Sequence, residues 1–268
     1  MRKPPVVWTI AGFDPSSGAG VTADLKTIAA LGGYGVACIT ALTVQNTLGV
    51  QRVEVVSAET IRQTLRALLE DLPPAAIKIG MLATAEITGA VSEFVEALPE
   101  PRCPVVIDPI LRSSSGTCLL EAQGVRLLRG WLIRMATVVT PNRAEAAALT
   151  GLAEDDGEAL ALAVRQLGAK AAVVTGGDEA GDDYSEDVLA YELEGMELVE
   201  TLRAPRILSE ATHGTGCAFS TAIACGLAQG QSIPRAVTAA KAFVGRAIEM
   251  APGLGQGKGP MGLEKAGE

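Results

Sequence analysis

Residues 6–31 read VVWTIAGFDPSSGAGVTADLKTIAAL, and this stretch decides the fold class. Its first six residues form an apolar run typical of a buried strand, and the glycine-containing loop 12–20 ends that run. Beyond the loop, apolar side chains recur at the spacing of one helix face, at Val21, Leu25, Ile28 and Leu31. A strand, a loop and a helix in this order are the first half of the unit that builds parallel sheets.

The same alternation continues along the chain. Short runs rich in valine and isoleucine predict further strands at 35–42, 76–80, 105–109, 137–140 and 171–175, with helical segments between them. Within 188–204, two β-rich stretches flank Glu194-Gly195, which predicts a small antiparallel hairpin at the sheet edge. The expected fold class is α/β, a three-layer α/β/α sandwich around a mostly parallel central sheet.

The C-terminal part is predicted to be helical, with long Ala-rich helices at 214–229 and 232–250. Residues 252–262 contain too much glycine for regular structure. No proline- or serine-rich linker and no internal repeat interrupts the sequence. With 268 residues, 48% of them hydrophobic, the chain is expected to form one domain, 1–268.

Composition narrows the possible function classes. The formal net charge of -9 argues against general binding to nucleic acid or anionic membranes, which requires clustered cations. The five cysteines form no C-x-x-C pair and there is one histidine, so no zinc cluster is predicted. The start of the chain does not resemble a leader, no apolar run is long enough to span a membrane, and scattered cysteines suit a reducing compartment. We therefore expect a cytoplasmic protein.

The strongest chemical motif is Thr-His-Gly-Thr-Gly-Cys at 212–217, placed directly before an apolar helix. Gly214 and Gly216 let several backbone N–H groups turn inward, and the helix N-terminus adds partial positive charge at the same place. Such a loop forms an anion hole, which transfer of a phosphoryl group requires. For this motif alone, an ordinary glycine-rich turn into a helix is the alternative.

Cys217 falls in the first turn of that helix, where the dipole is expected to lower the thiol pKa below about 8.5. The thiol is then a candidate base for the proton of a substrate hydroxyl. Because the transition state of phosphoryl transfer is loose and needs little early deprotonation, closing and polarising the anion hole is an equally good role. A small buried apolar side chain is the plain alternative.

A second group of polar residues follows two neighbouring strands. Asp108 follows one apolar run, and Asn142 and Glu145 lie one turn apart after the next. Their oxygen atoms suit Mg²⁺, directly or through water, as ATP chemistry requires. Asn142 and Glu145 also match the pattern of a helix capping box, which needs no metal.

Three single residues carry weaker signals. Asp24 is most simply a favourable charge early in a helix, whereas the amide of Gln45 offers the donor and the acceptor that a heterocycle edge needs. His213 is expected to be a structural turn residue, because no carboxylate is evidently placed to orient it as a base.

The common nucleotide motifs are absent from the sequence. Gly257-Lys258 lacks the spacing of a Walker loop, and Gly253-Leu254-Gly255 follows a helix rather than a strand.

Together, these motifs resemble those of the bacterial hydroxymethylpyrimidine/phosphomethylpyrimidine kinases of thiamine biosynthesis, in the ribokinase-like superfamily. The matching runs are TIAGFDPSSGAG at 9–20, ADLKT at 23–27, QNTLGV at 45–50, KIGML at 78–82, TPNRAE at 140–145 and THGTGC at 212–217. The resemblance implies a ribokinase-like fold without a separate lid domain, and usually a homodimer. It also implies phosphorylation of the hydroxymethyl group of 4-amino-5-hydroxymethyl-2-methylpyrimidine, then of its monophosphate, with ATP and Mg²⁺.

The resemblance implies roles for individual residues. The transferring phosphoryl group is held by Gly214, Thr215, Gly216 and Cys217. The pyrimidine pocket is lined by Gly12, Asp24, Gln45, Gly80, Met81 and Ile110. ATP is held by Asp108, Thr140, Asn142, Glu145, Thr175, Gly177 and Thr212, with Asp108 and Glu145 serving the metal.

Two positions depart from the family pattern. Ser114 stands where a lysine is common, and Thr175-Gly176-Gly177-Asp178 stands where Lys-Gly-Gly-His is common. Loss of a cation near phosphate slows transfer, so the second phosphorylation is expected to be the less efficient step, with Arg112 as a partial replacement. Two alternatives stay open: a pyridoxine-type vitamin kinase, and a regulatory protein that binds the pyrimidine without efficient catalysis.

Overall fold

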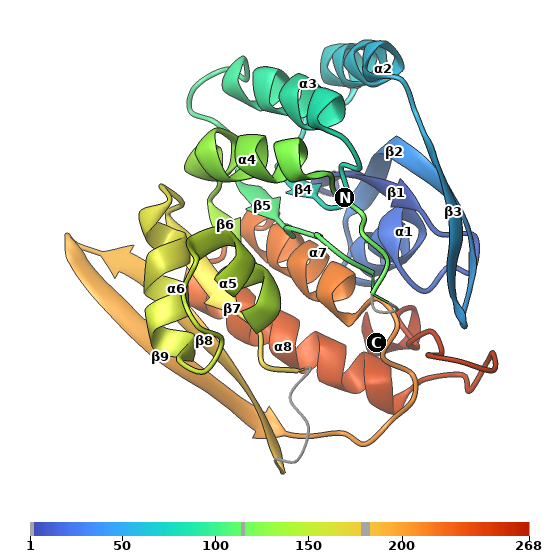
Figure 1. The fold of residues 1–268 in the computed structure, drawn as a ribbon, viewed down its shortest axis with the longest axis vertical. Coiled ribbons are helices and arrows are strands. Elements are labelled where there is room, and N and C mark those ends of the chain that lie inside the picture. Colours follow the sequence, from blue (N-terminus) through green and yellow to red (C-terminus); the bar gives the residue numbers. More distant parts are fainter. Residues whose placement is uncertain (1–2, 114–115, 178–182, 268) are drawn as a thin grey trace.

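The computed structural model describes residues 3–113, 116–177 and 183–267. In these residues one nine-stranded sheet runs through the molecule in the order β3-β2-β1-β4-β5-β6-β7-β8-β9 (Figure 1). Strands β2, β1, β4, β5, β6 and β7 are parallel, whereas β3 at one edge and the β8–β9 hairpin at the other are antiparallel to their neighbours. The strands are β1 (Val6–Phe13), β2 (Tyr34–Asn46), β3 (Gly49–Val55), β4 (Ala76–Ile79), β5 (Val105–Ile107), β6 (Val138–Val139), β7 (Ala171–Val174), β8 (Tyr184–Leu193) and β9 (Met196–Pro205).

Helices cover both faces of the sheet and form a separate apolar core on each. The first core contains residues of α2 (Ala58–Asp71), α3 (Ala85–Glu96), α4 (Ala122–Gly130), α5 (Arg143–Thr150) and α6 (Gly157–Gln166). The second contains residues of α1 (Gly20–Ala30), α7 (Thr215–Ala228) and α8 (Ile233–Glu249). Two short 3-10 helices, η1 (Leu132–Met135) and η2 (Lys265–Gly267), complete the described elements. None of the described helices is long and apolar enough to cross a membrane.

Successive side chains of each strand alternate between the two cores, as the period of two along a strand requires. In β1, Trp8 and Ile10 belong to the first core and Val7 to the second. In β4, Ile77 and Ile79 belong to the first core, so Lys78 between them points to the opposite face, toward α1 and α7. A lysine is therefore buried between the sheet and two helices.

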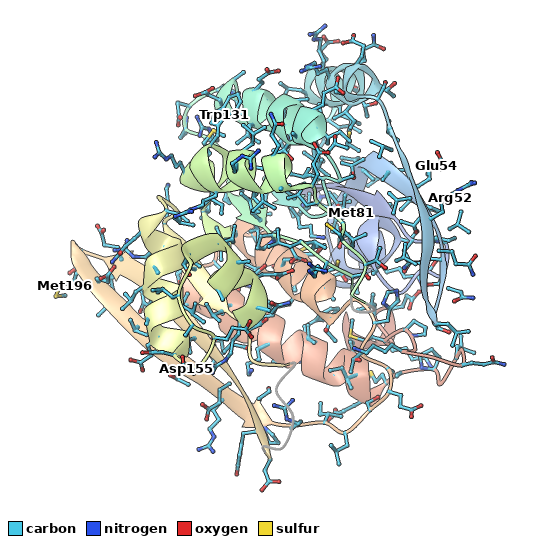
Figure 2. The ribbon with its side chains drawn as sticks, viewed as in Figure 1. Arg52, Glu54, Met81, Trp131, Asp155 and Met196 are labelled. Atoms are coloured by element: carbon cyan, nitrogen blue, oxygen red, sulfur yellow. The ribbon has the colours of Figure 1, made fainter. Side chains whose placement is uncertain are left out.

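The predicted sandwich with a mostly parallel sheet is confirmed, and so is the hairpin at one edge. Its turn is Glu194-Gly195, where both residues have positive φ, as a two-residue hairpin turn favours. At the other edge the prediction was incomplete, because β2 continues to Asn46 and pairs with β3, which was not predicted. Figure 2 shows Arg52 and Glu54 projecting from β3, where they form an exposed ion pair at 3.0 Å. Residues 252–262 contain no helix or strand, as expected.

Candidate active site

A cleft of about 1680 Å³ opens at the carboxyl ends of the parallel strands. Its walls come from the loops after β1, β4, β5, β6 and β7, the end of β2 and the start of α7. Ligands of open α/β sheets bind at this edge. A pocket for one small molecule commonly measures about 300–1,000 Å³, so the cleft has room for two ligands side by side.

The anion-hole loop forms the start of α7. Gly214 is the N-cap residue and lies in the left-handed region with φ 80, a conformation that glycine adopts without strain. A Cβ at this position would come within 1.9 Å of the carbonyl oxygen of Gly18, so the loop also packs tightly on the loop after β1. The first N–H groups of α7 therefore face the cleft from a backbone that only glycine allows.

The loop after β1 is held by the buried carboxylate of Asp14. It accepts hydrogen bonds from Ser16 N at 2.8 Å, Ser16 Oγ at 2.7 Å and Ala19 N at 2.9 Å. Burial alone raises the pKa of Asp14, but the hydrogen bonds from His213 and Ser16 outweigh it, so the pKa lies below its ordinary value. Asp14 is ionised at neutral pH and accepts hydrogen bonds only.

His213 has the orienting carboxylate that sequence reasoning did not find. Its Nε2 lies 2.8 Å from Asp14 Oδ2, although the two residues are 199 positions apart, and 3.2 Å from the amide nitrogen of Gln45. The backbone N–H of His213 donates to Gly259 O at 3.2 Å, which ties the C-terminal loop to the same place. The expectation that no carboxylate orients His213 was wrong, because tertiary contact supplies one.

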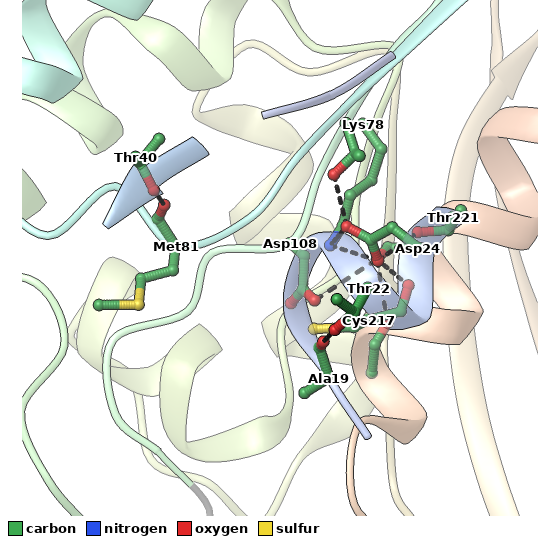
Figure 3. A network of polar contacts seen from close by, with 12 residues as sticks. Ala19, Thr22, Asp24, Thr40, Lys78, Met81, Asp108, Cys217 and Thr221 are labelled. Atoms are coloured by element: carbon green, nitrogen blue, oxygen red, sulfur yellow. Dashed lines mark hydrogen bonds and ion pairs between the residues drawn. The ribbon is translucent and has the colours of Figure 1, made fainter. Parts of the chain in front are cut away.

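Behind the cleft lies a buried ion pair that the sequence reading missed. Lys78 Nζ donates to Asp24 Oδ2 at 2.9 Å and to Oδ1 at 3.1 Å, and both side chains are fully buried (Figure 3). Thr9 and Thr221 also donate to the carboxylate of Asp24, at 2.5 and 2.8 Å. A Cβ at Gly80 would come within 3.0 Å of Lys78 Nζ, so this glycine leaves room for the ammonium group.

The Asp24 carboxylate is therefore saturated with donors. Asp24 and Gly80 are not among the residues that line the cleft; they support it from behind. The simplest interpretation of the sequence made Asp24 a favourable charge near the start of a helix. In the structure α1 begins at Gly20, and Asp24 lies beyond its first turn. The other residues expected in the pyrimidine pocket do line the cleft, namely Gly12, Gln45, Met81 and Ile110.

Cys217 is buried, and its burial raises the thiol pKa to about 12. The nearby Lys78 ammonium and the backbone N–H of Gly20 favour the thiolate but do not offset the loss of solvent. The expectation of a pKa below the ordinary thiol value was therefore wrong. Cys217 does lie in the first turn of α7, but desolvation is the largest influence on its pKa, so the group is a thiol at neutral pH.

Asp108 is the carboxylate best suited to a metal. It lines the cleft while 5% exposed, and burial raises its pKa to about 6 despite the opposing charge of Lys78. A desolvated carboxylate at the mouth of an anion hole fits a cation that bridges to phosphate. Glu145 fits through water, because its two oxygens accept hydrogen bonds from Leu111 N and Asn142 N. Asn142 and Glu145 form the capping box of α5 that was the alternative reading.

The residues expected to bind ATP lie along the same cleft. All of them contribute to its lining: Asp108, Thr140, Asn142, Glu145, Thr175, Gly177 and Thr212. The described residues contain no cluster of three or more His, Cys, Asp or Glu side chains suited to a metal. A metal here would depend on the nucleotide's phosphates for the rest of its ligands, as Mg²⁺ commonly does.

A family model described as phosphomethylpyrimidine kinase matches residues 14–262. The chain belongs to the phosphomethylpyrimidine kinase family. It is 43% identical over 261 residues to the hydroxymethylpyrimidine/phosphomethylpyrimidine kinase of Streptomyces coelicolor, which covers 96% of this chain and 94% of that protein. The resemblance drawn from the sequence motifs is confirmed, and the chain is a kinase.

Two kinds of solved structure share the fold of this family member. The phosphomethylpyrimidine kinase of Clostridium difficile superposes with a TM-score of 0.76 at 36% identity, over 91% of this chain and 99% of that one. The pyridoxal kinase of Staphylococcus aureus in complex with ADP superposes with a TM-score of 0.87 at 32% identity, over 98% and 94%. The ribokinase-like fold is thereby confirmed, and ATP is the phosphoryl donor that fits these kinases.

Of the two departures from the family pattern, Ser114 and Asp178 lie outside the described residues. Thr175 lines the cleft, and its N–H donates to Pro141 O at 2.9 Å. Lys241 of α8 lines the cleft as well, where its Nζ donates to Asp187 Oδ2 at 2.8 Å and Ser185 Oγ at 3.2 Å. The cleft therefore contains a lysine, although at neither of the two positions where the family pattern commonly has one.

Proposed function

We propose that this kinase phosphorylates the hydroxymethyl group of 4-amino-5-hydroxymethyl-2-methylpyrimidine with ATP in the cytoplasm, and then its monophosphate in a slower second step. One observation carries the proposal. The anion-hole loop meets the pyrimidine residues at one end, where His213 contacts Gln45, and the nucleotide residues at the other, where Gly216 faces Asp108. A phosphoryl group in this loop lies between donor and acceptor sites.

The chemistry rests on position and charge rather than on a strong base. In phosphoryl transfer, negative charge spreads over the equatorial oxygens, and the N–H groups at the start of α7 are aimed at that charge. Because the thiol of Cys217 stays protonated, we assign it to closing the anion hole. Its hydrogen can point at a phosphate oxygen, and its size keeps water out of the loop.

Mg²⁺ and ATP complete the proposed reaction. Asp108 would hold the metal directly and Glu145 through water, and bound Mg²⁺ neutralises charge on the phosphate oxygens. Lys241 places an ammonium group, paired with Asp187, in the same cleft. The role of these residues toward ATP is supported by their shared lining of one cleft.

The experiment is a kinase assay on two alcohols with Mg-ATP, following ADP and the phosphorylated product. Pyridoxine is the second candidate substrate, because pyridoxal kinases share the fold with a TM-score of 0.87. We expect kcat/KM for the pyrimidine to exceed that for pyridoxine at least about tenfold, and EDTA to abolish both. Absence of pyrimidine phosphate at high enzyme concentration would refute the proposal, and tight pyrimidine binding without ADP formation would favour the regulatory alternative.

Replacement of Cys217 separates its two possible roles. We expect Cys217→Ser to retain kcat within about tenfold, because a hydroxyl also donates to a phosphate oxygen, and Cys217→Ala to lose more, because it cannot. Steady-state turnover of the pyrimidine alcohol measures both. An essential base would give the contrary pattern, with both variants equally inactive.

The expected homodimer stays a prediction. Leu42 and Val44 of β2 lie on the outer face of the sheet edge, 48% and 43% exposed, beside Arg52 and Glu54 of β3. An exposed apolar strip at a sheet edge favours burial against a second copy. Light scattering tests this, since a dimer has twice the mass of the 27.5 kDa chain.

A further inference from the structure

Three polar side chains form a chain of contacts from the loop after β1 to the end of β2. Asp14 Oδ2 lies 2.8 Å from His213 Nε2, and the same Nε2 lies 3.2 Å from the amide nitrogen of Gln45. All three residues line the cleft. Family resemblance assigns a substrate-binding role to Gln45 alone. The roles of Asp14 and His213 have to be inferred from the hydrogen bonds that the three side chains can form with one another.

The first contact determines which nitrogen of His213 carries a proton. Asp14 is an ionised carboxylate that already accepts from Ser16 and Ala19, and it has no proton to donate. A lone pair on Nε2 at 2.8 Å from Oδ2 would repel it. Nε2 therefore bears a hydrogen and donates it to Asp14.

The second contact then determines how the Gln45 amide is turned. An Nε2–H group facing the amide NH₂ would bring two donors together, which forms no hydrogen bond. A half-turn of the amide places its Oε1 in the same position, where it accepts a share of the Nε2–H bond. In that orientation the NH₂ group of Gln45, a residue that lines the cleft, is the part of the amide that can donate to a ligand.

Packing keeps the imidazole in place. A Cβ at Gly18 would come within 2.2 Å of His213 Cδ2, so the ring lies directly against the backbone of the loop after β1. The backbone of His213 is tied to Gly259 and leads into Gly214, whose own Cβ has no room. A ring flip would remove Nε2 from Asp14, leaving a buried carboxylate with one donor fewer.

We propose that His213, held by Asp14, is a positioning residue that makes Gln45 an obligate hydrogen-bond donor to the substrate. The inference rests on the proposed function, because Gln45 must face the heterocycle. A ring nitrogen with a lone pair matches an NH₂ group in that place, whereas a substrate edge that offers N–H does not. The pair thus selects heterocycles that present an acceptor to Gln45.

The proton position is measurable without any substrate, because His213 is the only histidine of the chain. In untagged protein labelled with ¹⁵N-histidine, long-range ¹H–¹⁵N correlation spectra contain one imidazole and need no assignment. We expect Nε2 to be protonated in the free enzyme at neutral pH. An Nδ1–H tautomer with bare Nε2 would overturn the proposal, whether or not the proposed substrate binds.

Two isosteric variants test the consequence for binding. The amide NH₂ of glutamine reaches the position of Nε2, and that of asparagine the position of Nδ1, so His213→Gln keeps the donor and His213→Asn loses it. We expect His213→Asn to raise KM for the pyrimidine alcohol about tenfold with kcat within about threefold, and His213→Gln to restore KM. Equal KM values for the two variants, or a loss confined to kcat, would overturn the relay.

Replacement of the third member tests the direction of the hydrogen bond. Gln45→Glu can still accept from His213, but it presents a carboxylate oxygen in place of the NH₂ group. We expect calorimetry to show at least a tenfold weaker affinity for the pyrimidine alcohol, on the order of a lost hydrogen bond. Unchanged affinity would overturn the donor assignment, and absence of binding by the wild-type chain would refute the proposed function while the tautomer measurement still tests the relay.

Discussion

Gly214→Ala is expected to lower kcat at least about 100-fold, the scale of losing a preorganised donor to a developing anion. The added methyl would lie 1.9 Å from Gly18 O, and the residue has φ 80, so the loop must move for both reasons. Moving the loop turns the first N–H groups of α7 away from the phosphoryl group. Turnover of the pyrimidine alcohol under saturating Mg-ATP measures the effect.

Gly230→Ala is the matched control for this variant. Gly230 lies just beyond the other end of α7, also has positive φ at 84, and a Cβ there meets no atom within 4 Å. It shares the backbone strain, about 1–2 kcal/mol, without the clash at the cleft. We expect reduced thermal stability with unchanged kcat; a Gly214→Ala enzyme that turns over as fast as Gly230→Ala would contradict the role of the loop.

Lys78→Met is expected to lower the free energy of unfolding by about 3–5 kcal/mol, because it leaves the Asp24 carboxylate buried without its cation. Burial is the largest single influence and lowers the pKa of Lys78, but the nearby acidic groups, Asp24 foremost, and the hydrogen bond to Asp24 together outweigh it. The pKa of Lys78 therefore lies above its usual range, and the side chain is an ammonium group in the folded protein. Urea denaturation followed by circular dichroism measures the loss. The double variant Lys78→Met/Asp24→Asn should recover part of it, because a neutral amide can accept from one of Thr9 and Thr221 and donate to the hydroxyl oxygen of the other.

Lys26→Met provides the comparison on the surface. Lys26 is a residue of α1, as Asp24 is, and it forms an ion pair with Glu264 at 3.1 Å. Unlike the Lys78–Asp24 pair, these two side chains are 36% and 62% exposed. An exposed pair of this kind contributes about 1 kcal/mol or less. If the two lysine variants lost equal stability, the claim that Lys78 and Asp24 support the cleft as a desolvated pair would fail.

Hydrophobic pattern predicted most of the sheet, and its failures have local causes. β3 was missed because Gly49–Val55 alternates valine with Gln51, Arg52 and Glu54, an edge strand with one solvated face. The burial of Lys78 could have been predicted, because it is the one charged residue in the apolar run 76–79, and such a run indicates a strand that is buried along its whole length, as β4 is. Such a lysine needs a buried partner, and Asp24 was the acid of the neighbouring helix.

The candidate site was predictable where a short sequence motif by itself determines the backbone geometry. Residues 214–217 form the predicted glycine loop at a helix start, because local sequence determines that geometry. The pKa of Cys217 was not predictable, since it depends on burial between α7, β4 and β5 rather than on the helix alone. The Asp14–His213 contact joins residues 199 positions apart, which no local pattern records.

The most direct test of the central claim follows the phosphoryl group itself. Mass spectrometry of a reaction containing Mg-ATP, the pyrimidine alcohol and wild-type chain should detect the pyrimidine monophosphate and equimolar ADP, with the diphosphate appearing later. Gly214→Ala at equal concentration should form at most about one hundredth as much monophosphate at early times. ADP without pyrimidine phosphate, or equal product from both proteins, would contradict a kinase that holds the transferring group at residues 214–217.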